Sequence, residues 1–274
     1  MSERAAIARS ERPATIASLT EDLTGLGVTE GMTLMVHSSL SALGYVAGGA
    51  QSVVEALRAA VGRDGTLMMP THSADLSDPS AWMNPPIPEE WWDTVRDSMP
   101  AYDPATTPTR AMGAIADCFR RSPGAVRSGH PTVSACAVGP QAEALASGHT
   151  FEIGLGEGSP QARLYDLDGH VLLLGVTHAN NTSLHLSEHR AAPAHAPRQA
   201  VGSPMLIDGE RQWVTAELLA EDETDFARIG EDFARKGMQA TGQVALATAH
   251  LMRCRDIVDH GAAWMQRYRT WSAD

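Results

Sequence analysis

Apolar residues change between helical and strand-like spacing along the first quarter of the chain. Residues 15–26 and 50–61 carry them at helical spacing, and each of these segments ends at a glycine. Two short apolar runs, 33–37 and 66–70, are typical of buried strands. Because each strand is followed by a turn and a helix before the next strand, the pattern predicts parallel strands with helical crossovers.

The same change of spacing returns after the first hundred residues. We predict helices over 112–120 and 141–146, and strands over 133–138 and 171–176, with the last strand fully buried. Together with the first quarter, this pattern predicts an α/β fold. Its centre is expected to be a mixed, largely parallel sheet flanked by helices.

The C-terminal region has a different pattern. Residues 222–271 are interpreted as two or three helices interrupted at glycines, which gives a helical C-terminal part. Residues 213–215 follow an Asp-Gly turn and are expected to form an edge strand. Since no repeat, low-complexity tract or linker divides the chain, we predict one domain over residues 1–274.

Residues 75–108 interrupt the alternation of predicted helices and strands. This segment holds seven prolines and three tryptophans, Trp82, Trp91 and Trp92. A long irregular segment in a compact domain often serves as a lid or binding loop, and we expect an active-site loop here. The alternative is an insertion that its tryptophans anchor to the core, and the sequence leaves both interpretations open.

Charge and cysteine content narrow the class of protein. The chain has 21 basic and 33 acidic residues, a net charge of −12, which disfavours nucleic acid or an anionic membrane as partner and favours a cationic ligand. Alternatively, the net negative charge serves only to keep the protein soluble. The three cysteines are far apart, and no apolar run approaches the ~20 residues of a membrane span, so we expect a soluble cytoplasmic protein. The oligomeric state, with a homodimer as one option, stays open.

The most informative segment contains His185, Glu188 and His189. On a helix, residues three or four positions apart share a face, so Glu188 can reach the His185 ring. A carboxylate that orients an imidazole and stabilises its protonated form produces a general base. The same letters, H-x-x-E-H, also spell a zinc-peptidase pattern.

The zinc interpretation requires a third protein ligand and an open position for water. Glu217, Glu221 and Glu231 follow the motif, so composition alone does not exclude a zinc hydrolase. However, a helix that starts after Asn-Asn-Thr, directly behind a strand, does not resemble a peptidase helix.

Two further polar turns lie next to predicted elements. His37-Ser38-Ser39-Leu40 lies at the carboxyl end of a predicted strand, where ligands gather in parallel sheets, and Thr107–Gly113 leads into a predicted helix. Taken alone, each turn is explained better as a helix cap than as a binding site. Nucleotide-binding patterns of the G-x-G-x-x-G and Walker A types are missing from the chain.

In combination, these motifs resemble the aminoglycoside 3-N-acetyltransferase family, over roughly residues 15 to 265. The resemblance runs in order through His37-Ser38-Ser39-Leu40, Gly65–Thr71, Met112-Gly113, Arg127–Pro131, Gly158-Ser159-Pro160, Val171–Val176 and Thr182–Glu188. It implies a fold distinct from that of the common GNAT acetyltransferases. It also implies a link to antibiotic resistance, with acetyl-CoA as co-substrate and no metal.

The resemblance also implies roles for individual residues. His185 would be the general base, Glu188 would orient it, and the amine would attack the thioester directly. For the oxyanion donor we expect Thr182 or a nearby backbone N–H. The CoA pantetheine and phosphates would run past six residues: Ser38, Ser39, Leu40, Thr109, Met112 and Gly113.

A cationic acceptor, an aminoglycoside or similar polyamine, requires carboxylates. We expect Asp75, Glu223 and Asp225 to supply them, although the acidic run at 221–225 is equally typical of a solvated helix start. His189 and Arg190 depart from the family motif. The family's specificity for its acceptor therefore cannot be assumed for this chain, and acetyl transfer to a different amine stays an alternative.

Overall fold

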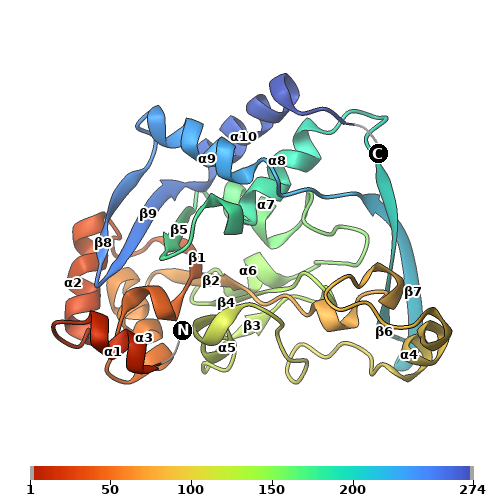
Figure 1. Cartoon of the computed structure of the whole chain (residues 1–274), viewed down its shortest axis with the longest axis horizontal. Coiled ribbons are helices and arrows are strands. Elements are labelled where there is room, and N and C mark those ends of the chain that lie inside the picture. Colours follow the sequence, from red (N-terminus) through yellow and green to blue (C-terminus); the bar gives the residue numbers. More distant parts are fainter. Residues whose placement is uncertain (1–2, 272–274) are drawn as a thin grey trace.

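The computed structural model describes residues 3–271. Its centre is a seven-stranded sheet with the strand order β3-β4-β2-β1-β5-β9-β8 (Figure 1). In that order the strands are Val126–Arg127, Ala135–Val138, Thr66–Pro70, Thr33–Ser38, His170–Leu174, Ala247–Arg253 and Ala240–Val244. The three middle strands are parallel, and those outside them pair antiparallel. The expected mixed α/β sheet is therefore confirmed, with the parallel part at its centre.

One face of the sheet packs on helices from the first half of the chain. Leu34 and Val36 of β1 point to this side, while Met35 between them belongs to the opposite core. This alternation follows from the two-residue period of a strand, and it gives a buried strand apolar residues on both faces. The helices on this face are α2 (Ile16–Leu26), α3 (Gly49–Val61) and α5 (Gly113–Phe119), and α1 (Glu3–Arg9) and the 3-10 turn η1 (Leu40–Leu43) lie near them.

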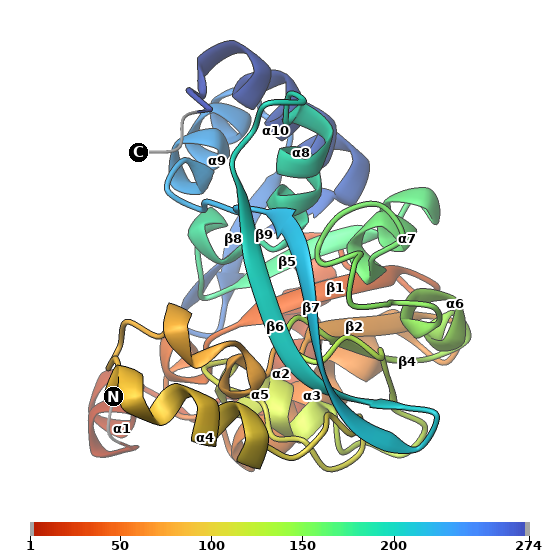
Figure 2. The ribbon, with the colours of Figure 1, turned by 90° about the vertical axis from the view of Figure 1, so that its right-hand side faces the viewer.

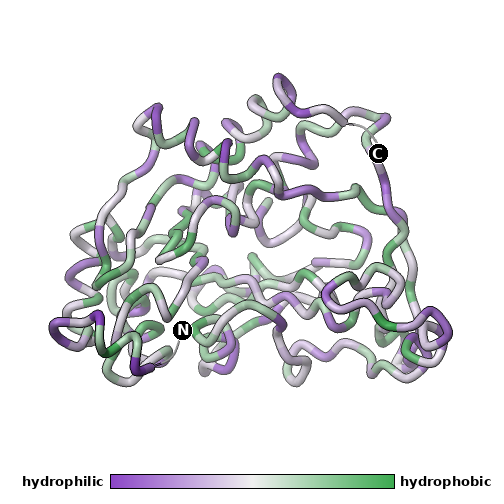
Figure 3. The backbone as a smooth tube through the Cα atoms, viewed as in Figure 1, coloured by the Kyte–Doolittle hydropathy of each residue, from purple (hydrophilic) through white to green (hydrophobic). Residues whose placement is uncertain are grey.

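The opposite face is covered mainly by helices from the second half. These are α6 (Ala142–Ala146), α7 (Pro160–Asp166), α8 (Ser183–Ala191), α9 (Phe226–Arg235) and α10 (Cys254–Tyr268), with η5 (His178–Asn180) before α8. Hydrophobic stretches of the backbone trace lie mainly in the interior of the molecule, while many of the turns at its edge are hydrophilic (Figure 3). No helix within residues 3–271 has the length and apolarity needed to cross a membrane.

Local signals explain where several helices begin and end. Thr15 and Ser18 form a reciprocal capping box at the start of α2, and Gly27 ends that helix in the left-handed conformation. Ser159 caps α7, and Pro160 occupies its first turn. The predicted helices and strands up to residue 176 are confirmed within a few residues.

The helical interpretation of residues 222–271 is only partly right. Helices α9 and α10 are present, but β8 and β9 form an antiparallel hairpin between them, and β9 pairs with β5. Burial alternates at the start of β9, where Ala247 and Ala249 face the core and Thr248 is exposed. Because the core residues here are small, the two-residue period is weak in the sequence.

A long hairpin stands apart from the main sheet. It consists of β6 (Arg198–Ile207) and β7 (Glu210–Leu219), so the expected edge strand at 213–215 is part of β7. The turn residues Asp208 and Gly209 both have positive φ, 52° and 82°, which suits a two-residue hairpin turn. Figure 2 shows the hairpin running across one side of the molecule.

The hairpin anchors the proline-rich segment 75–108. Tyr102 donates its backbone N–H to Pro204 at 3.0 Å, and Ser203 donates its hydroxyl to Leu76 at 2.8 Å. Four short helices lie within or at the start of the segment: η2 (Ala74–Leu76), η3 (Pro79–Ala81), η4 (Glu89–Trp91) and α4 (Trp92–Ser98). The segment is thus an anchored excursion. The cavity described next is lined by His72 before the segment and by Ala111 and Met112 after it, and residues 75–108 are not among its lining residues.

Candidate active site

A cavity of about 350 Å³ opens at the carboxyl ends of the three parallel strands. In the middle of the sheet the chain leaves β1 towards β2 on one side, and later places β5 on the other. Ligands bind at such a switch point because the connections diverge there and leave a crevice. The walls come from the ends of the three strands and the segments that follow them. They include His37 and Ser38 at the end of β1, Pro70 at the end of β2, His72 after it, and Asn180, Asn181, Thr182 and His185 after β5, together with Met112, Glu223 and Phe226.

Helix α8 carries the predicted motif to this cavity. Asn181 accepts the Ser183 N–H on its side-chain oxygen at 3.2 Å, which fixes the turn where α8 begins. Ser187 donates to the Val258 carbonyl of α10 at 3.0 Å, and Gly261 allows α10 to approach this point closely. The helix is therefore held against α10 by its inner face.

The structure brings His185 and Glu188 together. Nδ1 of His185 lies 2.6 Å from Oε2 of Glu188, whose side chain is fully buried. The other carboxylate oxygen of Glu188 accepts the Asp222 N–H at 2.8 Å and contacts the Arg269 guanidinium. Because every partner of this carboxylate is a donor, it can only accept from His185. Nε2 of His185 is therefore free to take a proton.

Electrostatics favour the protonated form of His185. Burial opposes the charge, but the hydrogen bond to Glu188 and the negative charges of Glu221, Glu188 and Glu223 outweigh it. The pKa of His185 is raised as a result. The ring also packs edge-on against Phe226, with centroids 4.8 Å apart, which restricts its rotation.

Two further histidines line the same cavity and are neutral. Burial, aided by neighbouring histidines, lowers the pKa of His37 to about 3 and that of His72 to about 4. The sequence singled out His37 only as part of a turn and did not single out His72. Since His72 stands two residues after β2, the rule that ligands gather at strand carboxyl ends could have identified it.

The predicted CoA-contacting residues fall into three groups. Ser38 and Met112 line the site cavity, and a Cβ at Gly113 would lie 3.9 Å from the Ser38 carbonyl oxygen, so these two motifs meet. Leu40 lines a second cavity, and Ser39 connects the two. Thr109 is half-buried just before α5 and is not among the lining residues of either cavity.

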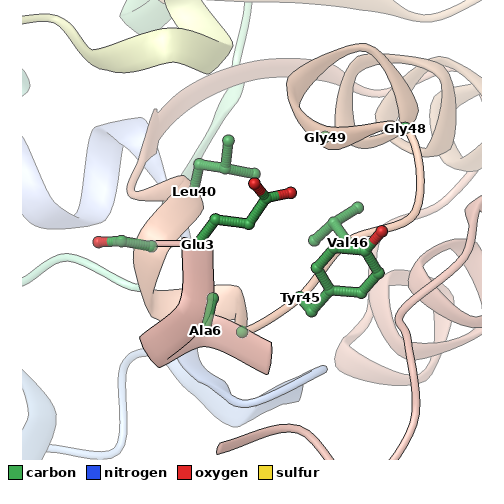
Figure 4. Close-up of a pocket in the computed structure, with 9 residues that line it drawn as sticks. Glu3, Ala6, Leu40, Tyr45, Val46, Gly48 and Gly49 are labelled. Atoms are coloured by element: carbon green, nitrogen blue, oxygen red, sulfur yellow. The ribbon is translucent and has the colours of Figure 1, made fainter. Parts of the chain in front are cut away.

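The second cavity has a volume of about 540 Å³ and lies beside the amino end of α3 (Figure 4). Leu40, Tyr45 and Val46 form its apolar walls, Gly48 and Gly49 leave the backbone open, and Glu3 of α1 points into it. The turn Ser38-Ser39-Leu40 therefore runs from one cavity to the other.

The structure separates the three expected acceptor carboxylates. Glu223 lines the site cavity. Asp225 instead pairs with Arg269 at 3.1 Å and with Arg228 at 3.3 Å, and Asp75 pairs with Arg110 beside a smaller, separate cavity. The structure therefore brings only Glu223 to His185. Glu221, which belongs to the acidic run considered for the cationic acceptor and is also a candidate zinc ligand, lies there too: its Oε2 is 3.9 Å from His185 Nδ1.

The side chains of the H-x-x-E-H motif do not converge on one point. His189 binds Glu221 through Nε2 at 3.0 Å, whereas His185 binds Glu188 through Nδ1. Within residues 3–271, no group of three or more His, Cys, Asp or Glu side chains is arranged to hold a metal ion. This geometry does not support the zinc-hydrolase alternative.

Comparison with known proteins gives the family. A family model described as aminoglycoside 3-N-acetyltransferase matches residues 35–266. The chain belongs to this family. The YokD protein of Bacillus subtilis, an aminoglycoside N(3')-acetyltransferase-like protein, is 42% identical over 92% of both chains, and its crystal structure superposes with a TM-score of 0.93 over 96% of this chain and 97% of that one. Aminoglycoside N(3)-acetyltransferase VII of Streptomyces paromomycinus is 40% identical over 97% of this chain and 96% of its own.

Solved structures of family members include ligand-bound ones. AAC-IIIb with CoASH is 30% identical, with a TM-score of 0.83 over 96% of this chain and 100% of that chain. AAC-VIa bound to sisomicin is 31% identical, also with a TM-score of 0.83, over 94% of this chain and 100% of that chain. Membership in this acetyltransferase family confirms the expected resemblance and enzyme class, an acyltransferase that uses acetyl-CoA.

Proposed function

We propose that the protein transfers acetyl from acetyl-CoA to the 3-amino group of an aminoglycoside, with His185 as general base. The observation that carries this proposal is the His185–Glu188 pair, 2.6 Å apart, on the wall of the cavity at the carboxyl ends of β1, β2 and β5. The family, the ligand-bound relatives and the volume of the cavity are consistent with it.

The pair suits removal of a proton from an amine. A protonated amine has no lone pair for attack, so it must lose a proton to a base. His185 offers Nε2, and Glu188 stabilises the imidazolium that results. When the tetrahedral adduct collapses, the same imidazolium can return this proton to the departing thiolate, and the attacking nitrogen loses its second proton to solvent, which leaves a neutral amide. The reaction then requires no covalent enzyme intermediate.

The arrangement of the two cavities suggests a route for CoA. We propose that the thioester lies near Ser38 and Met112, and that the pantetheine chain follows Ser39 and Leu40 towards the second cavity. Gly113 begins α5 beside this path with a φ of 82°, a backbone conformation that favours glycine. A CoA contact for Thr109, on the approach to α5, stays a prediction.

Carboxylates beside His185 suit a cationic acceptor. Glu223 lines the cavity and Glu221 lies next to the base, so we propose that both face the ammonium groups of the aminoglycoside. Asp75 and Asp225 already have arginine partners, and their contribution to acceptor binding stays a prediction. The single domain over 1–274, the cytoplasmic location and the homodimer option also remain predictions.

We propose that the Thr182 hydroxyl donates a hydrogen bond to the oxyanion that forms on the acetyl group. Its hydroxyl lies 3.5 Å from His37 Nε2 and 3.4 Å from Gln161 Nε2, and both distances are long for hydrogen bonds. The hydroxyl can therefore turn towards the acetyl oxygen.

A direct assay tests the proposal. Purified protein is mixed with acetyl-CoA and a panel of aminoglycosides, free thiol is followed, and the acetylated position is assigned by NMR. We expect turnover with N3-acetylated product. Thiol release with other amines only would support the alternative of a different acceptor and contradict this proposal.

A further inference from the structure

A second histidine–carboxylate pair lies next to the general base. Nε2 of His189 donates to Oε1 of Glu221 at 3.0 Å, because an ionised carboxylate can only accept. The other oxygen of Glu221, Oε2, lies 3.9 Å from Nδ1 of His185. The side chains of His189 and Glu221 are 22% and 25% exposed, so water screens the pair only in part. One carboxylate therefore lies between the two histidines of α8.

The surroundings of the His189 ring limit its movement. His189 stands four positions after His185, so both side chains lie on one face of α8. Gly156 packs against the His189 ring, and a Cβ at this glycine would lie 2.5 Å from Nδ1 and 2.9 Å from Cε1. A larger residue at position 156 would therefore displace the ring.

The chain around Glu221 is tied to the same helix. Glu221 stands in the connection between β7 and α9, and the next residue, Asp222, donates its N–H to the Glu188 carboxylate of α8 at 2.8 Å. This bond fixes the backbone of the connection beside α8. Since Oε1 of Glu221 is bound to His189, Oε2 is the oxygen that faces the base.

We propose that His189 is a positioning residue, which holds one oxygen of Glu221 so that the other oxygen stays beside His185. This inference rests on the proposed function, in which His185 is the base. A carboxylate at this distance stabilises the imidazolium that forms when His185 takes the amine proton. Because His189 already binds Oε1, Oε2 is also the oxygen left for an ammonium group of the acceptor.

The charges around His185 agree with this role. Burial lowers the pKa of His185, and the two largest effects that raise it are the hydrogen bond to Glu188 and the charge of Glu221, followed by the charges of Glu188 and Glu223. Burial also opposes the charge of Glu221, but the bond from His189 and the neighbouring histidines lower the pKa of Glu221, which is therefore ionised at neutral pH. Three other titratable or charged groups interact with this cluster: His72, which is neutral, Asp222 and Arg269.

NMR titration of His185 in ¹⁵N-histidine-labelled protein tests this role without any substrate. In His189→Leu the Glu221 carboxylate loses its partner and can turn towards solvent, so the midpoint of the His185 titration should move about 0.5–1 pH unit lower. His189→Gln retains an amide N–H donor and should restore most of the wild-type midpoint. Arg190→Met is the matched control, because Arg190 is the next residue of α8 but pairs with Glu157, and its midpoint should equal that of the wild type. An unchanged midpoint in His189→Leu, or an equal change in Arg190→Met, overturns the proposal.

A double variant tests whether the effect passes through Glu221. Glu221→Gln should lower the His185 midpoint by itself, because it removes the negative charge beside the ring. Adding His189→Leu to Glu221→Gln should then change the midpoint by less than about 0.2 pH unit, since His189 no longer has a charge to position. Additive changes would overturn the proposal. Turnover of the wild type tests the proposed function, whereas the titration requires no turnover, so the two can fail separately.

Discussion

Arg269 contacts the carboxylate of Glu188, although the two residues are 81 positions apart. Arg269 follows the last turn of α10, and Glu188 lies in the middle of α8. The guanidinium also binds Asp225 at 3.1 Å and the Asp222 carbonyl at 2.8 Å. One arginine therefore ties α10 and the start of α9 to the carboxylate that orients His185.

Arg269→Met should weaken both the fold and the base. Removing one member of a buried ion pair typically costs about 3–5 kcal/mol, because the other charge loses its partner. Without this positive charge, the pKa of His185 should rise further. We expect a lower free energy of unfolding in urea and an activity profile shifted to higher pH. Arg267→Met, at an exposed position in the last turn of α10, is the matched control and should change stability by less than about 0.5 kcal/mol. Equal effects of the two substitutions would contradict the role of Arg269.

The pH profile of the wild type follows from the raised pKa of His185. The base must be neutral to accept a proton, so kcat/KM should rise with pH and level off above the pKa of His185. Since that pKa is raised, the midpoint should lie above the usual value of about 6.5. In Glu188→Gln the hydrogen bond to the carboxylate and its negative charge are lost while burial remains, so the midpoint should move to lower pH and kcat should fall. A profile that stays flat from pH 5 to 9 would rule out this base.

His185→Ala should reduce kcat by about 10²- to 10⁴-fold, the usual contribution of a general base. CoA affinity, measured by calorimetry, should change little, because the predicted CoA contacts lie on β1, the following turn and the start of α5. His195→Ala is the control, since His195 is exposed and outside the cavity. Wild-type turnover in His185→Ala would exclude His185 as the base.

The parts of the site that are close in sequence were predictable, and the long-range contacts were not. His185 and Glu188 are one helical turn apart, so the sequence alone predicts that they meet. The position of the His37 turn follows from the end of a buried strand. In contrast, Arg269 reaches Glu188 only through the packing of α10 on α8, and no local pattern encodes that contact.

Two other differences have local causes. At the start of β9 the core residues are alanines, which give a weak alternating signal, and the glycine in β8 is as typical of a helix break as of a strand. The sequence predicts one acidic group at 221–225, but in the structure the side chains of this run point in different directions where α9 begins. Glu223 faces the cavity, whereas Asp225 faces Arg269.

Gly261→Ala should destabilise the protein, although alanine normally stabilises a helix relative to glycine by about 0.8–1 kcal/mol. A Cβ at position 261 would lie 2.6 Å from the Ser187 hydroxyl oxygen and 2.8 Å from a Leu184 methyl carbon. To admit it, α8 must move away from α10, which costs about 1–3 kcal/mol and disturbs the Glu188–Arg269 contact. The matched control is Gly25→Ala in α2, where no atom lies within 4 Å of the added carbon. Urea unfolding should give a lower free energy for Gly261→Ala and a higher one for Gly25→Ala, and only the former should lower kcat. If both substitutions stabilise the protein, the close approach of α8 and α10 does not position the base.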